Sequence, residues 1–226
     1  IDDLKDFSKE NKIRSLGLCD TTNLCGALEF AEKLSKVGTQ PIIGTQINFS
    51  YGDTTGLLPL FALNEIGYKR IIELSSLSFL KNDEVSDPHL DFEELLKHDE
   101  GIALFSGTVL GFFGQLFNKG KFSEIEDLYK KLKSTYDDRF YIEIQRHGDQ
   151  NEISFEKYNL NKSNDLEIAI IATNEVFYMS KDMHEAHDAL ICIKDKTYVN
   201  EKNRNKFTDQ HYFKNDIEMS ELFFDV

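Results

Sequence analysis

The hydrophobic pattern of the chain changes period at residue 20. Residues 15–19 form a short, mostly apolar run typical of a buried parallel strand, and the apolar residues of 24–31 then recur at helical spacing. Residues 21–23 carry side-chain oxygens that suit a helix start. We therefore predict a strand, a tight turn and a helix, with Asp20 at the point of change.

Strand-like and helix-like runs alternate along most of the chain. Alternating or β-branched apolar segments predict strands, and apolar residues three or four apart predict helices. Asn64 is expected to cap the helix that follows it. Further strands are expected at residues 41–49, 57–63, 101–108, 140–147 and 166–177, and helices at 2–14, 64–74, from 111 onward, and at 124–136, 182–193 and 216–223.

The polar and acidic segment 81–99 interrupts this alternation. We expect it to leave the core of the fold, with a short helix at 92–97 and with His89 and His98 on the surface. No strand-like run precedes the predicted helix at 2–14, so we expect the first strand of the fold to be missing from this sequence.

About six strand-then-helix units in series predict a parallel sheet with right-handed crossovers. The fold class is therefore α/β, a distorted TIM-like barrel of the (β/α)7 type. We place the barrel domain at residues 1–195. Residues 196–226 are more polar and irregular, and we read them as a segment that connects to further domains.

The composition fits a packed cytoplasmic protein. The 226 residues are 40% hydrophobic and include 18 Phe, and no apolar run approaches the roughly 20 residues that cross a bilayer. The first residues show no export signal. Three cysteines, Cys19, Cys25 and Cys192, lie in apolar segments without metal-type spacing, so we expect reduced, buried thiols.

The net charge of −14 argues against a segment that wraps nucleic acid on its own, because phosphate binding depends on Lys and Arg. One basic cluster late in the chain is expected to be solvated, with contact to a phosphate in a larger assembly as the alternative. Its members are Lys194, Lys196, Lys202, Arg204 and Lys206.

The exits of parallel strands converge at one mouth of a barrel, where β/α folds place their chemistry. The polar residues at the predicted exits are Asp20, Thr21, Gln46, Thr108, Arg146, His147, Asn174 and Glu175, with Glu143 pointing inward on its strand. A hydrolytic metal site needs a ring rich in His, Asp and Glu. This ring is mostly amides and hydroxyls, so Asp20, Glu175 and His147 would hold at most one ion weakly.

Structural interpretations of the same residues stay open. Asp20 is suited to cap the helix that follows it, and Glu143 to pair with Arg146 or another base. His184 and His187, three apart on a predicted helix, could chelate a metal. With no carboxylate or thiol evident nearby, we expect one of them partly buried and the other exposed.

Seven motifs occur in one order along the chain and together resemble the polymerase-and-histidinol-phosphatase (PHP) domain of bacterial DNA polymerase III alpha subunits. They are CDTTNLCGALEF, KVGTQPIIGTQ, NEIGYKRIIELSS, FSGT, YIEIQRHG, IIATNEVFY and EAHDALICI. The later motifs and the tail NRNKFTDQHYF resemble the polymerase version rather than free-standing phosphatases.

The resemblance implies that a metal site has been lost. Metal-binding members look like Asp-His at 20 and 21, Glu at 46, Cys or His near 108 and Asp-x-His at 175 to 177, and a His-x-His pair that opens the family's first strand is not in this sequence. The matching positions here are Asp20, Thr21, Gln46, Thr108, Glu175 and Phe177. Thr and Gln are poor ligands for a transition metal, and Phe is none.

The resemblance also implies a function. We expect a metal-free, non-catalytic scaffold that supports a replicative DNA-directed DNA polymerase and contacts its proofreading exonuclease (epsilon) subunit. The parent chain would use Mg and bind DNA and the other holoenzyme subunits. The alternative is an active PHP phosphoesterase or 3′–5′ exonuclease. An unrelated small-molecule barrel enzyme would leave the ordered motifs unexplained.

Overall fold

The computed structural model describes residues 1–82 and 86–226 and divides into two compact units. Unit 1 comprises Ile1–Ile144 and Phe155–Ile171, and unit 2 comprises Gln145–Ser154 and Ala172–Val226. The domain boundary predicted at residue 195 stays a prediction.

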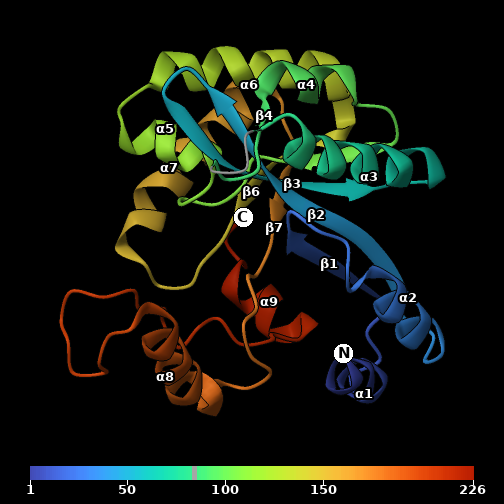
Figure 1. The fold of residues 1–226 in the computed structure, drawn as a ribbon, viewed down its shortest axis with the longest axis vertical. Helices are drawn as coiled ribbons and strands as arrows, with labels where there is room; N and C mark the ends of the chain where they lie inside the picture. The colour runs from blue at the N-terminus through green and yellow to red at the C-terminus, as the bar shows by residue number, and fades with distance from the viewer. Residues whose placement is uncertain (83–85) are drawn as a thin grey trace. The chain divides into compact units, whose positions relative to one another are not determined.

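Unit 1 is built on one sheet in the order β1-β2-β3-β5-β6-β7, with β4 paired to β2. The sheet curls into an open half-barrel whose end strands are β1 and β7 (Figure 1). Its strands are β1 Ser15–Thr21, β2 Gln40–Tyr51, β3 Thr54–Ala62, β4 Leu90–Asp91, β5 Ile102–Phe105, β6 Phe140–Ile144 and β7 Ile170–Ala172.

The direction of β3 corrects the prediction of a wholly parallel sheet. β3 runs antiparallel to both β2 and β5, whereas β1 with β2 and β5 with β6 are parallel. Only residues 52 and 53 separate β2 from β3, too few for a crossover helix, and Gly52 adopts φ 59° in the turn. The α/β class and the barrel-like curl are confirmed, but the sheet is mixed.

Most predicted helices are present, and α7 was missed. Asn64 caps α3 as expected, since its Oδ1 accepts a hydrogen bond from the Gly67 amide at 3.0 Å. The buried face of α7 is Phe155, Asn159 and Ser163, so it has little apolar periodicity to detect. The helices up to residue 166 are α1 Asp2–Glu10, α2 Ala27–Ser35, α3 Glu65–Leu80, α4 Phe92–Lys97, α5 Phe112–Asn118, α6 Phe122–Tyr136 and α7 Gln150–Leu166.

Aromatic side chains form much of the core of unit 1. Phe92 stacks on Phe112 with ring centroids 5.5 Å apart, and Phe113 lies 4.5 Å from Tyr129. The buried Tyr129 hydroxyl donates to Asn159 Oδ1 at 3.1 Å, so its polar atom is satisfied inside the core. The barrel interior predicted from the apolar pattern is therefore a packed core.

The segment 81–99 is tied to the sheet more closely than predicted, although residues 83–85 lie outside the described part. β4 pairs with β2, and the side chains of Phe92 and Leu95 are buried. His98 is only 14% exposed and lies 3.7 Å from Glu73, and His89 is half-buried. The surface placement was therefore wrong for His98, whereas His89 keeps part of its surface exposed.

Unit 2 contains the short helix η2 Lys181–Met183, α8 His184–Asp195 and α9 Asp216–Leu222. Arg204 is not solvated with the other members of the basic cluster. Its guanidinium binds both carboxylate oxygens of Asp188 at 2.6 and 2.7 Å, and the Arg204 side chain is 4% exposed. A bidentate partner explains why this one basic side chain turns inward.

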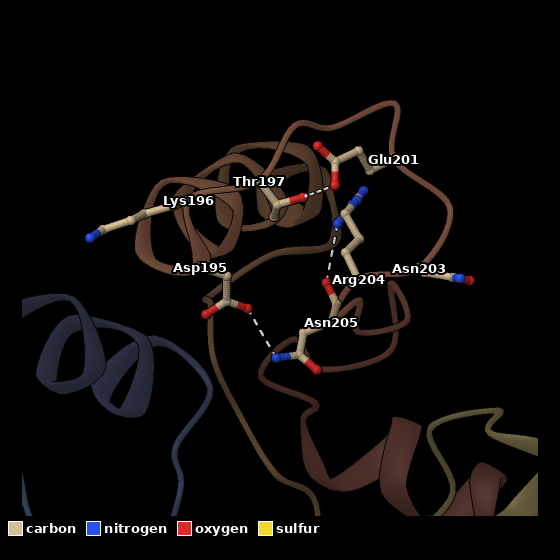
Figure 2. A pocket seen from close by; sticks show the side chains of 7 residues that line it. All are labelled: Asp195, Lys196, Thr197, Glu201, Asn203, Arg204 and Asn205. Atoms are coloured by element: carbon tan, nitrogen blue, oxygen red, sulfur yellow. Dashed lines mark hydrogen bonds between the residues drawn. The ribbon is translucent and has the colours of Figure 1, made fainter.

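An open hollow of about 770 Å³ lies beside this pair in unit 2 (Figure 2). Its two carboxylates are already engaged, because Asp195 accepts from Asn205 at 2.9 Å and Glu201 accepts from Thr197 at 2.7 Å. Both carboxylates that line the hollow are therefore hydrogen-bonded within unit 2.

None of the three cysteines forms a disulfide bond in the described part of the chain. Cys192 is buried on α8 and Cys19 is half-buried, but Cys25 is exposed. Cys25 precedes the start of α2 rather than lying on its buried face, which explains the wrong prediction for this residue.

Candidate functional site

Three of the predicted positions lie together on β1 and β2 of unit 1. Thr21 pairs in register with Gln46, and Gln46 Nε2 donates to Thr21 Oγ1 at 2.8 Å. Asp20 is within β1, half-buried, and burial raises the pKa of its carboxyl group. Two of the three side chains thus bind each other.

The predicted helix start after Asp20 was wrong. Residues 22–26 form turns, and α2 begins at Ala27. Asn23 Oδ1 accepts a hydrogen bond from the Cys25 amide at 3.0 Å, so Asn23 stabilises a turn instead of capping the helix. Asp20 is likewise not the helix cap, because the N-cap residue is Gly26.

Thr108 and Glu143 are the other two positions in unit 1. Thr108 is half-buried in the loop after β5, where its Oγ1 accepts from the Leu110 amide at 3.2 Å. Glu143 lies on β6 with 5% of its surface exposed, as its predicted inward direction requires. The Glu143 amide donates to Ser106 Oγ at 2.9 Å.

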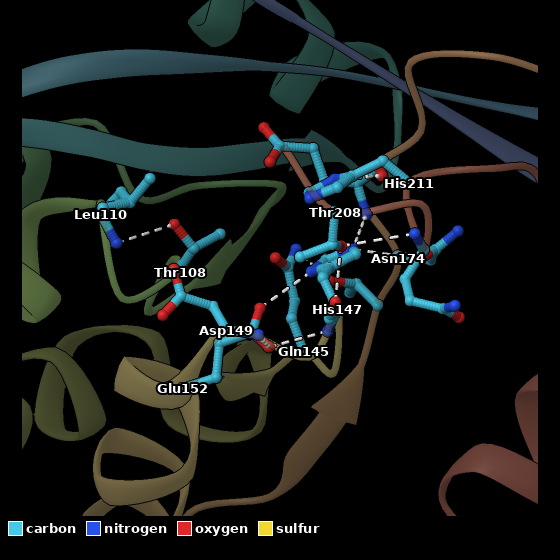
Figure 3. A network of polar contacts seen from close by, with 12 residues as sticks. Thr108, Leu110, Gln145, His147, Asp149, Glu152, Asn174, Thr208 and His211 are labelled. Carbon is cyan, nitrogen blue, oxygen red and sulfur yellow. Dashed lines mark hydrogen bonds and ion pairs between the residues drawn. The ribbon is translucent and has the colours of Figure 1, made fainter. Parts of the chain in front are cut away.

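His147 is the centre of a polar network in unit 2 (Figure 3). The ring is buried, and its Nδ1 lies 2.9 Å from Glu152 Oε1. On the other side, Nε2 lies 3.1 Å from Asn174 Oδ1 and 3.2 Å from the Glu175 amide nitrogen. Both ring nitrogens are therefore engaged by neighbouring residues.

His211 lies against the same ring, and sequence reasoning missed it. The two imidazoles stack with centroids 4.0 Å apart and planes within 1°, and His211 Nδ1 lies 3.1 Å from the Glu175 carbonyl oxygen. Burial, followed by the adjacent His147 ring, lowers the pKa of His211 to about 4. His211 is thus neutral at pH 7.

Three further groups complete this network. Burial opposes ionisation of Glu152, but hydrogen bonds from the His147 ring and amide outweigh it, so the pKa of Glu152 is lowered. Burial raises the pKa of Glu175. Lys214 Nζ lies 3.2 Å from Asn174 Oδ1, and burial lowers its pKa. Glu152 and Lys214 were not predicted as site residues, because the apolar pattern of their segments predicted no strand or helix there.

Phe177 and Arg146 contact other parts of unit 2. The Phe177 ring stacks on His187 at 5.2 Å and on His211 at 5.0 Å. Arg146 binds Asp225 at 2.6 Å and lies over the Phe223 ring, with its guanidinium carbon 4.9 Å from the centroid. Arg146 is therefore held by the segment after α9.

The predicted ring of polar residues is thus divided between the units. Unit 1 holds Asp20, Thr21, Gln46, Thr108 and Glu143, and unit 2 brings His147, Asn174 and Glu175 into contact. The convergence of all of them on one mouth stays a prediction.

A tight multinuclear metal centre does not fit the described side chains. Within residues 1–82 and 86–226, no group of three or more His, Cys, Asp or Glu is placed to hold a metal ion. Phe177 has no donor atom, and Gln46 is bonded to Thr21. His184 Nε2 lies 3.0 Å from the Phe207 carbonyl oxygen, and both His184 and His187 are half-buried, which corrects the expectation that one would be exposed.

Comparison with known proteins shows the family of the chain. Residues 1–147 match the PHP domain family. The chain belongs to the PHP family. This PHP chain is 35% identical over 233 residues to DNA polymerase III subunit alpha of Caulobacter vibrioides, covering 100% of this chain and 20% of that protein. The predicted resemblance is confirmed.

Two further relatives of the PHP chain carry the same name. The Rickettsia felis protein is 35% identical over 227 residues, covering 100% of this chain and 19% of its own, and the Vibrio cholerae protein is 31% identical over 216 residues, covering 94% and 19%. The PHP chain thus spans about a fifth of the length of these relatives.

Among solved structures, a putative metal-dependent phosphoesterase from Bifidobacterium adolescentis resembles the PHP chain with a TM-score of 0.38 and 11% sequence identity, covering 76% of this chain and 80% of the other.

Among the described residues, no helix combines the length and apolar character needed to span a membrane.

Proposed function

We propose that this chain is the PHP domain of a DNA polymerase III alpha subunit, where it acts as a metal-free scaffold that supports the polymerase and contacts the proofreading exonuclease (epsilon) subunit. The names of its relatives support the parent polymerase. DNA binding, Mg-dependent nucleotidyl transfer and contacts to other holoenzyme subunits then belong to the parent chain, which we expect in the cytoplasm.

The observation that carries the metal-free role is the bonding of His147. A histidine ligand gives one ring nitrogen to the metal and uses the other to orient its ring. In unit 2, Nδ1 bonds Glu152, and Nε2 lies within hydrogen-bond distance of both Asn174 Oδ1 and the Glu175 amide, of which it bonds one in a given tautomer. His147 therefore links neighbouring segments of unit 2 to one another, which supports a structural role instead of a metal-binding one.

The packed core of unit 1 supports the scaffold role. Tyr129 and Phe113 are fully buried, and the Tyr129 hydroxyl is satisfied by Asn159. A domain that has kept a close-packed interior while losing metal donors retains the rigidity needed to hold neighbouring domains.

Metal content tests the proposal against an active PHP phosphoesterase or 3′–5′ exonuclease. The full-length alpha subunit, purified without chelators, should contain far less than one zinc or manganese ion per chain by elemental analysis. Two or three such ions per chain, with phosphatase activity that is lost in Asp20→Ala, would overturn the metal-free role.

Cross-linking mass spectrometry of the intact complex of alpha with epsilon tests the contact. We expect lysine cross-links between epsilon and residues 1–226 of this segment. Cross-links that involve only the rest of the alpha chain, with peptides of this segment well covered, would contradict the contact.

A further inference from the structure

Helix α8 exposes a row of apolar side chains. The row, here called the α8 stripe, consists of the N-cap residue Met183 and of Ala186, Leu190 and Ile193 on the helix, at intervals of three, four and three residues. Met183, Leu190 and Ile193 are 45%, 63% and 74% exposed. The buried positions of α8 are on its other side and include Cys192. The helix therefore has one packed face and one uncovered apolar face.

This spacing is that of a helix that packs against another helix. Intervals of three and four residues keep side chains on one line along a helix and form the seam of two-helix packing. Single exposed apolar residues are ordinary on a protein surface, but a contiguous row marks an interaction site. The α8 stripe is such a row.

We propose that an amphipathic helix from the remainder of the same polymerase polypeptide covers the α8 stripe. This inference rests on the proposed function, since it needs the longer parent chain. In the relatives, about four fifths of the protein lies outside the matched segment, so such a chain has ample sequence to supply the helix.

The size of α8 favours this occupant over a second copy of the chain. With 12 residues, α8 is about 18 Å long at 1.5 Å per residue. Two such helices bury less than the roughly 1,200 Å² at which stable interfaces between separate proteins begin. Docking within one polypeptide needs less area, because the tether supplies a high effective concentration.

Thiol accessibility in the full-length alpha chain tests the proposal. Leu190→Cys and Ile193→Cys are compared with Leu28→Cys on α2, a residue that is 72% exposed in this structure. After a maleimide pulse, each site is read by peptide mass spectrometry, with native Cys25, which is also exposed, as the internal reference. We expect labelling at 190 and 193 to be at least about tenfold slower than at 28 when the chain is native, and equal in urea.

Equal native rates at positions 190, 193 and 28 would overturn the proposal. Protection that disappears on dilution, together with a two-chain mass by light scattering, would assign the stripe to a second copy and also overturn it. Metal content and epsilon cross-links are measured separately. Zinc in a protein whose thiols at 190 and 193 are protected would contradict the metal-free role but not the docking of a helix on the α8 stripe.

Discussion

The buried His211 side chain makes the folding stability of the protein depend on pH in the acidic range. Its ring is buried against His147, and Glu152 and Lys214 are the charged groups of the same network. The pKa of His211 is about 4 in the folded chain against an ordinary value of 6.5. Between these values the unfolded chain binds the proton and the folded chain does not, so stability is complete above pH 6.5 and falls toward pH 4.

We predict that His211→Asn removes this part of the pH dependence. The free energy of unfolding of the wild type should fall between pH 6.5 and 4 by at most about 1.4 kcal/mol per pH unit from this group. Urea unfolding at a series of pH values measures the difference between the two proteins. A variant whose stability declines in parallel with the wild type over this range would contradict the assignment.

Gly67 is a second position at which one side chain decides stability. A Cβ at this position would lie 1.8 Å from the Gly101 carbonyl oxygen, so α3 can approach the start of β5 only with glycine here. We predict that Gly67→Ala costs about 1–3 kcal/mol or more, although alanine is the better helix former by about 1 kcal/mol. The exposed Ser76→Ala on the same helix is the control and should be nearly neutral in denaturant unfolding.

At the scale of elements, the sequence predicts helices well where capping and apolar spacing agree. Asn64 and the apolar residues of α3 act together, and α3 is present. In α7 the buried positions Asn159 and Ser163 are polar because they bond the Glu143 and Ile168 carbonyl oxygens. The Glu143 carbonyl belongs to β6 and the Ile168 carbonyl lies just beyond the end of α7, so the apolar pattern of α7 itself reveals neither partner.

We predict that Asn64→Ala lowers the free energy of unfolding by about 1 kcal/mol, because the Gly67 amide loses its acceptor at the start of α3. Asn64→Asp keeps an acceptor at the same place and should retain most of the stability. The urea midpoints of the three proteins give the comparison. Equal losses in both variants would show that the cap is not the stabilising feature.

At the scale of the whole molecule, the sequence identified the family and the set of positions but not the network that surrounds His147. His147, Asn174 and Glu175 follow recognisable strand-like runs. Glu152 comes from the first turn of the missed helix α7, and His211 from an irregular segment. Long-range contacts of this kind leave no periodic trace, which explains why the candidate site was only half predicted.

Chelation provides a test at this same scale. If the domain holds no structural metal, EDTA should leave the unfolding temperature of the full-length alpha chain within about 1 °C, because a ligand raises stability only when it binds the folded state. Magnesium added back in excess controls for ions bound by the polymerase part. A fall of several degrees that zinc or manganese reverses, and magnesium does not, would argue for a resident metal.

The two-residue link between β2 and β3 bears on how the sheet assembles. Hairpins with short links close in about 1–10 μs, whereas the parallel pair of β1 and β2 must first place the intervening helix α2. We therefore expect the middle of the sheet to form first and to act as the template on which the outer strands are added. A slow step in refolding would then report the arrival of an edge strand, not the closure of the central ribbon.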